Sequence, residues 1–317
     1  MQLDNRKGAN FEMKKAVVFP GQGAQKPGMF MDLYESYDVV KTVFDQASQI
    51  IGNDLAQLCR EGSREEMSLT VNSQPLILAC GIAAWELYKM QNGRPEYLAG
   101  YSLGEYAALY AAGCISFTDV FKIIKIRAQA MQEAVPRGVG GMAAVIFSDE
   151  KKVTDYFHQN HRQVWIANYN TKGQVSIAGK IGDVQIACKE LDALGIITKQ
   201  LPVSAPFHCR LLEDAKIRIA EEIHRVSLMD AAVPVVTNVD GEAETDANAI
   251  RRKMVEQVVS PVQWIKTMDY LSDNGVTSFT ECGPGHTLSN FIRKMRYGNI
   301  HQHNIEDLDS LRKALAA

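Results

Sequence analysis

The chain has 317 residues, of which 46% are hydrophobic and 22% are charged, so it can bury a sizeable core as one large domain with an insertion or as two domains. A formal net charge of −3 gives no reason to expect a nucleic-acid or anionic-membrane partner. The longest apolar stretch, PLILACGIAAW at residues 75–85, is far shorter than the ~20 residues that a membrane-spanning helix needs.

The N-terminus and the cysteines favour a cytoplasmic protein. Residues 1–12, MQLDNRKGANFE, are polar and lack the apolar core of a signal peptide, so we interpret them as a loose extension before a start at Met13. The six cysteines are scattered without CxxC pairs, which argues against a zinc site and against a disulfide scaffold. We therefore expect reduced thiols and no bound metal.

Strands and helices alternate in the first part of the chain. A strand at residues 14–19, KKAVVF, ends at a loop rich in glycine and proline, and helical patterns follow around residues 32–51 and 74–90. A short apolar run, YLA at 97–99, then leads into GYSLGEY and a helix that stops near Gly113. Ser116 and Asp119 form a capping-box-like start for a further helix over residues 117–134.

Residues 139–205 predict a separate unit inserted in a larger one. Strand patterns occur at 142–147, 164–168, 174–179 and 198–203, and helical patterns at 149–160 and 182–194. This βαββαβ order is typical of a ferredoxin-like subdomain. Strands at 233–239 and 278–282 resume the larger domain, 13–138 plus 206–317, and the alternation predicts a mostly parallel α/β sheet.

A candidate nucleophile lies at one of the loops that follow these strands. Ligands bind beyond the carboxyl ends of the strands in such sheets, and the loops at 20–23, 100–104 and 283–285 all follow strands. Ser102 lies between two glycines where a strand passes into a helix, a position in which a serine can be lifted clear of the backbone as a nucleophile. Chance matches to Gly-x-Ser-x-Gly are common, so other residues must support this interpretation.

Arg127 lies on the apolar face of the helix at 117–134. It is four residues from both Ile123 and Met131, whereas the polar face of the helix lies elsewhere. A buried arginine cannot lose its charge and needs an anion. That anion is either a core carboxylate, in a purely structural ion pair, or the carboxylate of a substrate, which a guanidinium can bind through two parallel hydrogen bonds.

A serine nucleophile needs a general base, and His208 is the strongest candidate among the seven histidines. It lies where the inserted unit returns to the larger domain, and a domain junction is a preferred place for a cleft. A capping or packing role at the start of the following helix is the alternative. His286, in a Gly-Pro-Gly-His turn, is interpreted as a solvated loop residue. No Asp between Ser102 and His208 stands out as the third member of a triad.

Six motifs together resemble one enzyme family. FPGQGAQ, GYSLGEY, IRAQAM, APFHC, SPVQW and ECGPG occur in the order and spacing of malonyl-CoA:acyl carrier protein transacylases and of the related acyltransferase domains of polyketide synthases. The resemblance runs from about residue 14 to about residue 296. It implies an α/β-hydrolase-like large domain with a ferredoxin-like insertion.

The resemblance also implies a role for individual residues. It makes Ser102 the nucleophile, His208 its base and Arg127 the clamp on the malonyl carboxylate. The backbone N–H groups of Gln22 and Leu103 look like the oxyanion hole, and the backbone carbonyl of Gln263 looks like the group that holds the histidine tautomer, which would explain the missing Asp. The residues expected to line the cleft are Asn168, Phe207, Tyr101 and Met131.

Two of these residues bear on the substrate. Tyr101 departs from the family, whose members more often have histidine before the serine, and we expect it to alter packing or hydrogen bonding near Arg127. Phe207 resembles the bulky residue of malonyl-selective members, where it leaves little room for an α-methyl branch, although one methyl is worth only ~1–3 kcal/mol of discrimination.

We expect a monomeric acyltransferase without a bound cofactor. It would take malonyl from coenzyme A and pass it to the phosphopantetheine thiol of an acyl carrier protein, for fatty-acid or polyketide synthesis. A hydrolase on the same scaffold is an alternative, as is an inactive module that binds a carrier protein. Arg127 argues against the first, and the intact Ser102 and His208 argue against the second. A dinucleotide-binding interpretation of the loop at 20–23 fails because its glycines are out of register.

Overall fold

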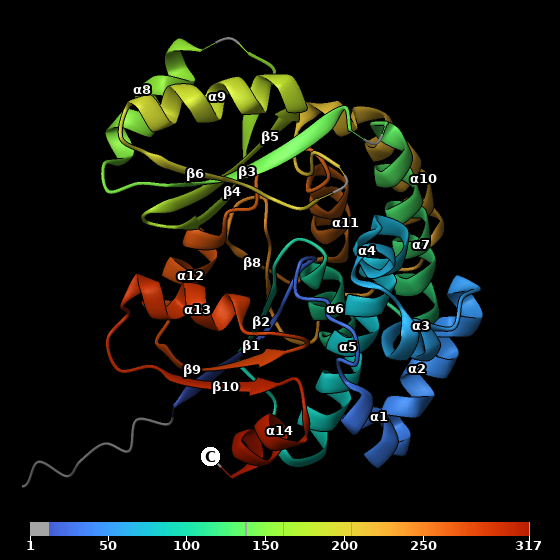
Figure 1. Cartoon of the computed structure of the whole chain (residues 1–317). Helices are drawn as coiled ribbons and strands as arrows, with labels where there is room; N and C mark the ends of the chain where they lie inside the picture. The colour runs from blue at the N-terminus through green and yellow to red at the C-terminus, as the bar shows by residue number, and fades with distance from the viewer. Residues whose placement is uncertain (1–12, 137, 161, 204, 317) are drawn as a thin grey trace, which may run out of the picture.

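The computed structural model describes residues 13–136, 138–160, 162–203 and 205–316 (Figure 1). The extension expected at residues 1–12 lies outside these residues. The described chain contains a six-stranded sheet and a four-stranded sheet, each covered by helices. We call the residues from β3 to β6 (140–200) the small unit and the remainder the large unit. Within the described chain, no helix is both long and apolar enough to cross a membrane.

The large sheet has the strand order β10-β9-β1-β2-β7-β8. Its neighbours pair in parallel except β7 and β8, so the prediction of a mostly parallel α/β sheet is confirmed. The strands are β1 (Lys14–Phe19), β2 (Tyr97–Gly100), β7 (Val235–Val236), β8 (Ala243–Glu244), β9 (Val276–Cys282) and β10 (His301–Ile305).

Helices cover both faces of this sheet. They are α1 (Met31–Ser36), α2 (Asp38–Ile51), α3 (Leu55–Glu61), α4 (Arg64–Ser68), α5 (Thr70–Gln91), α6 (Gly104–Ala111), α7 (Phe117–Ala134), the 3₁₀ turn η1 (Arg210–Leu212), α10 (Glu213–Arg225), α11 (Ala247–Glu256), α12 (Trp264–Asp273), α13 (Thr287–Met295) and α14 (Leu308–Leu315). Alternate residues of β1 point to opposite faces: Val17 and Phe19 join the cluster of α5 and α6, and Ala16 and Val18 join that of α12 and α13. Both faces of β1 are therefore buried, as its continuous apolar run requires.

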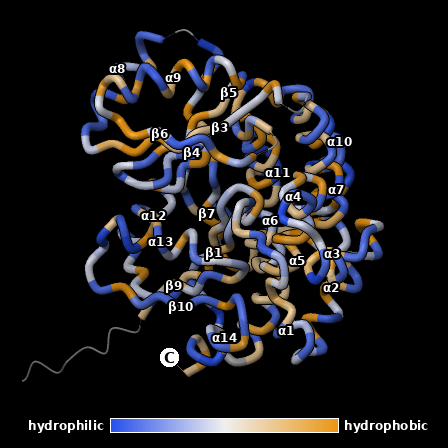
Figure 2. The backbone as a smooth tube through the Cα atoms, viewed as in Figure 1, coloured by the Kyte–Doolittle hydropathy of each residue, from blue (hydrophilic) through white to orange (hydrophobic). Residues whose placement is uncertain are grey.

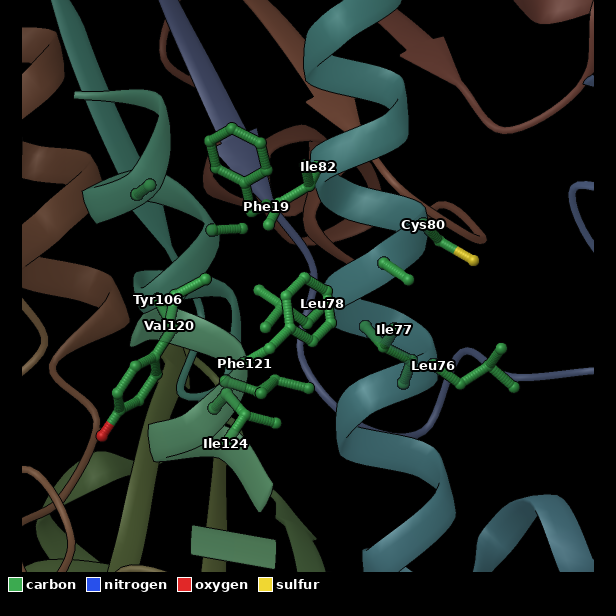
Figure 3. Close-up of a cluster of buried hydrophobic side chains, with 14 of the residues drawn as sticks. Phe19, Leu76, Ile77, Leu78, Cys80, Ile82, Tyr106, Val120, Phe121 and Ile124 are labelled. Atoms are coloured by element: carbon green, nitrogen blue, oxygen red, sulfur yellow. The ribbon is translucent and has the colours of Figure 1, made fainter. Parts of the chain in front are cut away.

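The main hydrophobic core lies between α5, α6 and α7. The helix α5 is apolar on most of its circumference, and Figure 2 shows it in the hydrophobic colours, whereas the outer helix α10 is largely hydrophilic. Figure 3 shows Leu78 of α5 beside Phe121 of α7, with Phe19 of β1 above them. The hydroxyl of Tyr106 points away from this cluster. The core thus fixes α6 and α7, the two helices that follow the Ser102 turn.

The small unit has the predicted order of elements. Its members are β3 (Gly140–Ile146), α8 (Glu150–Gln159), β4 (Val164–Thr171), β5 (Gln174–Lys180), α9 (Ile181–Ala193) and β6 (Ile197–Gln200). The sheet is antiparallel in the order β4-β5-β3-β6, and α8 and α9 lie on the same face of it (Figure 1).

Two elements differ from the sequence-based expectation. The helix expected around residues 32–51 is divided into α1 and α2, because Tyr37 has the extended conformation φ −131°, ψ 119°. The strand expected at residues 233–239 forms only at Val235–Val236, because the next residues turn back: the Gly241 N–H donates to the Thr237 carbonyl. Asn238 is thereby placed in a turn beyond the end of β7.

The loops after β1 and β2 meet at the carboxyl edge of the large sheet. A Cβ on Gly21 would lie 2.6 Å from the carbonyl oxygen of Tyr101, so only glycine permits this approach. The edge at which ligands were expected is therefore where the PGQG loop and the GYSLG turn lie side by side.

Candidate active site

Ser102 lies on the turn between β2 and α6. Its φ of +54° is in the left-handed region, which costs energy in a residue other than glycine and must be held by the surroundings. The turn packs closely on β1, since a Cβ on Gly104 would lie 2.1 Å from the Phe19 carbonyl oxygen. This is the sharp strand-to-helix turn that the Gly-x-Ser-x-Gly pattern predicts.

Asn238, beyond β7, holds the strained turn. Its side-chain oxygen accepts from the Ser102 N–H at 2.6 Å, and its amide nitrogen donates to the Gly100 carbonyl at 2.6 Å. The Asn238 N–H in turn donates to the Glu105 carboxylate at 2.6 Å. Glu105 is 1% exposed, and burial raises its pKa to about 7 despite that hydrogen bond. The buried Glu105 carboxyl thus helps to position Asn238, which in turn holds the Ser102 turn.

His208 is in contact with the serine across the domain junction. Its Nε2 lies 2.6 Å from Ser102 Oγ, and its Nδ1 lies 2.9 Å from the carbonyl oxygen of Gln257. A carbonyl oxygen only accepts, so Nδ1 carries the proton and Nε2 of the neutral ring accepts from the serine hydroxyl. Burial, followed by the charge of Arg127, lowers the pKa of His208 to about 4, so the ring is neutral at pH 7.

The carbonyl that orients His208 belongs to Gln257, and the expectation that it belongs to Gln263 is wrong. Gln263 is the N-cap of α12, and its carbonyl accepts the Thr267 N–H at 2.9 Å, as the first carbonyls of a helix do. A main-chain carbonyl in place of a carboxylate does account for the missing Asp.

The side chain of Gln257 connects the other site residues. Its amide nitrogen donates to the Ser102 carbonyl at 3.1 Å, and its amide oxygen accepts from Arg127 Nη2 at 3.2 Å. Because the main-chain carbonyl of Gln257 also accepts from His208, this one residue contacts the nucleophile turn, the base and the cation. Nothing in the run VEQVV at 255–259 distinguishes this glutamine from a surface one, so its role cannot be predicted from the sequence.

Arg127 is buried with no carboxylate partner. The residue is 1% exposed, and Nη2 lies 3.3 Å from Ser102 Oγ. Its guanidinium carbon lies 5.3 Å from the centre of the Tyr106 ring, a cation–π contact, and its Nε has no hydrogen-bond partner. Among the residues that the structure describes, no Asp or Glu forms an ion pair with it. The guanidinium therefore forms no direct ion pair within the described chain, although the charge of the buried Glu105 carboxyl acts on it through space. Its hydrogen-bonding edge is open to a substrate carboxylate.

Two backbone N–H groups beside Ser102 have no acceptor. Within the described chain, neither the Gln22 N–H nor the Leu103 N–H donates to any protein group. Leu103 begins the helical turn that leads into α6, so the positive end of a helix dipole also lies here. Free N–H donors next to a nucleophile are what stabilises an oxyanion during acyl transfer.

These groups surround one cavity of about 110 Å³ between the two units. The large unit contributes residues from the loops and from α5 and α7, and the segments around β3–β6 contribute the facing wall. The lining residues are Gln22, Gln74, Tyr101, Ser102, Leu103, Arg127, Met142, Asn168, Ser176, Leu201, Val203, Phe207 and His208. A site with a nucleophile, a neutral base, free N–H donors and an unpaired cation is equipped for acyl transfer from a substrate that carries an anion.

Comparison with known proteins agrees with this chemistry. Residues 16–304 match the family model described as the acyl transferase domain. The chain belongs to the acyl transferase family. It is 39% identical over 286 residues to the malonyl CoA-acyl carrier protein transacylase of Salmonella typhimurium, covering 88% of this chain and 92% of that one. It is 40% identical over 288 residues to the enzyme of the same name from Bacillus subtilis, covering 89% and 90%.

Solved structures of this acyl transferase family superpose closely. The malonyl CoA-acyl carrier protein transacylase from Coxiella burnetii has a TM-score of 0.92 at 34% identity, covering 96% of this chain and 97% of that one. A malonyl-transacylase solved in complex with a type II polyketide synthase acyl-carrier protein has a TM-score of 0.91 at 36% identity, covering 96% and 99%.

In this acyl transferase, three of the four expected cleft residues line the cavity and one does not. Asn168, Phe207 and Tyr101 line it. Met131 is fully buried in the core behind it, and its sulfur accepts from the amide of Gln74, which lines the cavity instead. Gln74 is 1% exposed and its Oε1 has no partner, so its polar group is available to a bound acyl chain.

Tyr101 differs from the expectation in its contacts. We expected it to act near Arg127, but its hydroxyl donates to Asn170 Oδ1 of the small unit at 2.5 Å, and its ring packs against Trp264 and Phe291. The side chain thus points from the turn into the junction between the units.

The remaining candidates lie away from the cavity. His286 is half exposed, and its Nε2 lies 2.6 Å from a Glu306 carboxylate oxygen, as suits a solvated loop histidine. Over the described residues, no cluster of three His, Cys, Asp or Glu side chains could hold a metal ion, and the six cysteines are free.

Proposed function

We propose that this acyl transferase moves a malonyl group from malonyl-CoA, through an acyl ester on Ser102, to the phosphopantetheine thiol of an acyl carrier protein. The single observation that carries the proposal is Arg127, a buried cation without a carboxylate partner whose Nη2 lies 3.3 Å from the serine hydroxyl. In a malonyl ester on Ser102 one methylene separates the ester carbonyl from a carboxylate, so the carboxylate can reach Arg127. The names of the relatives support the same substrate.

In the first half-reaction, Ser102 Oγ attacks the thioester carbonyl while its proton passes to Nε2 of His208. The negative charge that develops on the carbonyl oxygen is stabilised by the free N–H groups of Leu103 and Gln22. Collapse of the tetrahedral intermediate breaks the carbon–sulfur bond, and the departing thiolate takes the proton from His208. The second half-reaction repeats these steps in reverse with the carrier thiol as nucleophile.

The low pKa of His208 suits both half-reactions. Burial and the Arg127 charge hold it at about 4, so the base is unprotonated at neutral pH. The imidazolium that forms after proton transfer is more acidic than a solvated one, so it can protonate the leaving thiolate. Its orientation rests on the Gln257 carbonyl at 2.9 Å.

We also propose how the chain divides into domains. Residues 13–138 and 206–317 would form an α/β-hydrolase-like domain, and residues 139–205 a ferredoxin-like one. The parallel order around β1 supports the first, and the antiparallel order β4-β5-β3-β6 with both helices on one face supports the second. We propose a cytoplasmic monomer that needs no bound cofactor and takes no nucleic acid or membrane as partner, in keeping with free cysteines and a small net charge.

The test is direct observation of the acyl enzyme. Brief incubation with malonyl-CoA should add one malonyl mass to a peptide that contains Ser102, and addition of a phosphopantetheinylated carrier protein should remove it. Ser102→Ala should form no adduct. Rapid loss of the adduct to water without a carrier would instead indicate the hydrolase alternative. Transfer activity that survives in Ser102→Ala would refute the mechanism.

A further inference from the structure

The acyl cavity has walls from two units, so its width depends on how the small unit is held against the Ser102 turn. Main-chain bonds fix part of β4, since the Tyr169 N–H donates to the Val262 carbonyl and the Val262 N–H donates to the Ala167 carbonyl, each at 2.9 Å. These bonds fix the strand beside the cavity but do not contact the nucleophile turn itself.

Tyr101 makes that contact. Its hydroxyl donates to Asn170 Oδ1 at 2.5 Å, and the Asn170 amide nitrogen donates to Ser176 Oγ at 3.1 Å. The Asn168 side chain of β4 also interacts with the Tyr101 phenol, and an exposed contact of 3.5 Å joins Lys294 to Gln174. Asn170 and Ser176 are both buried, so water does not replace these partners when they separate.

The direction of each bond is determined. Burial raises the pKa of the Tyr101 phenol, so it stays protonated and donates, and the Asn170 oxygen must accept. The amide nitrogen is then turned toward Ser176, which lines the acyl cavity. The three side chains form a relay from the residue before the nucleophile, through β4, to the wall of the cavity on β5.

We infer that Tyr101 is a specificity-determining positioning residue, which through Asn170 and Ser176 fixes the small-unit wall of the acyl cavity and so excludes acyl groups branched at the α-carbon. The inference rests on the proposed malonyl transfer. Ser102 would hold one end of the malonyl group and Arg127 the other, so the α-carbon lies between them inside the cavity, whose lining includes Met142 and Ser176. A methyl branch there needs the wall to move.

The experiment compares kcat/KM for malonyl-CoA and methylmalonyl-CoA in the parent and in Tyr101→Phe. The phenylalanine keeps the ring packing against Trp264 and Phe291 and removes only the hydroxyl. We expect the malonyl preference, the ratio of the two kcat/KM values, to fall about two- to tenfold, the worth of one net hydrogen bond. Asn170→Ala should lower the preference similarly, and adding it to Tyr101→Phe should change the ratio little further.

Tyr156→Phe is the matched control. Tyr156 belongs to the small unit and, like Tyr101, would lose one hydrogen bond, of 2.7 Å to Glu190, but it does not line the acyl cavity. If the role of Tyr101 were merely structural, Tyr101→Phe would lower kcat/KM equally for both substrates, and the ratio would stay at the parental value.

The outcomes separate this inference from the proposed function. If the parent transfers malonyl but Tyr101→Phe keeps the parental malonyl-to-methylmalonyl ratio, the inference alone is overturned. The same holds if that ratio falls equally in Tyr156→Phe. A parent that forms no malonyl ester overturns the proposed function as well. If the malonyl preference falls in Tyr101→Phe and falls no further when Asn170→Ala is added, the result supports the relay.

Discussion

Replacing Arg127 by alanine should convert a malonyl-selective enzyme into one that no longer favours a carboxylate. The guanidinium is 1% exposed and has no carboxylate partner among the described residues, so it is free to bind the substrate. Removing one partner of a buried charge pair costs about 3–5 kcal/mol. At about 1.4 kcal/mol per factor of ten, malonyl loading should fall by about a hundredfold to a few thousandfold. Acetyl loading should stay the same or improve, because acetyl brings no charge to bury.

The assay is the rate of ester formation on Ser102 with malonyl-CoA and with acetyl-CoA, measured by mass under identical conditions. Arg127→Lys should restore little, because an ammonium lacks the planar fork that binds a carboxylate through two bonds. Lys122→Ala is a suitable control, since it removes a cation from the exposed face of the same helix. A malonyl-to-acetyl ratio that stays at the parental value in Arg127→Ala would refute the reasoning and leave the arginine a structural role.

Other residues of the site give further tests. His208→Ala should slow loading by about 10²–10⁴-fold, the usual contribution of a positioned base, in single-turnover measurements. Because the pKa of His208 is about 4, loading by the parent should stay level from pH 8 to about pH 5 and fall below that, and a midpoint near 6.5 would contradict the assignment. The fold raises the pKa of Glu105 from 4.5 to about 7, so this residue alone makes the folded state bind more protons and contributes a loss of stability as the pH rises across that window. His208, whose pKa is lowered to about 4, contributes in the opposite sense. The difference in urea-unfolding free energy between the parent and Glu105→Gln, measured at several pH values, should therefore show the Glu105 slope. Asn238→Ala should cost about 1–3 kcal/mol, because it leaves the Ser102 N–H and the Gly100 carbonyl unpaired, and an unchanged urea midpoint would count against that role.

The sequence predicted the parts of the site that leave a pattern in side-chain types. Arg127 stood out because a cation interrupts an apolar helical stripe, and the structure places it under the serine turn. Ser102 stood out through its flanking glycines, and His208 through its position at a domain junction. Each of these signals is local: it depends on the types of a few neighbouring side chains, which helical periodicity and turn composition reveal in the sequence.

The parts that escaped prediction depend on contacts between distant segments. Asn238 reaches the serine turn from the turn that follows β7, 136 residues further along the chain. Gln257 orients the histidine through its carbonyl, a group that every residue has, so a motif of side chains assigned the role to Gln263. Tyr101 was recognised as unusual, but its partner could not be named before the strand β4 was placed beside it.

The Gln257 carbonyl has a consequence for how the site responds to mutation. Every substitution at that position leaves a carbonyl in place. A saturation scan would therefore measure only the loss of the side-chain amide that contacts Ser102 and Arg127, and it would not detect the hydrogen bond that orients His208. The carbonyl is vulnerable to a different class of change. Deleting one residue between positions 258 and 262 would shift the main chain that follows α11, and we expect it to impair the enzyme more than Gln257→Asn does. Natural variants damaged in this way would appear as short deletions far along the sequence from every catalytic side chain.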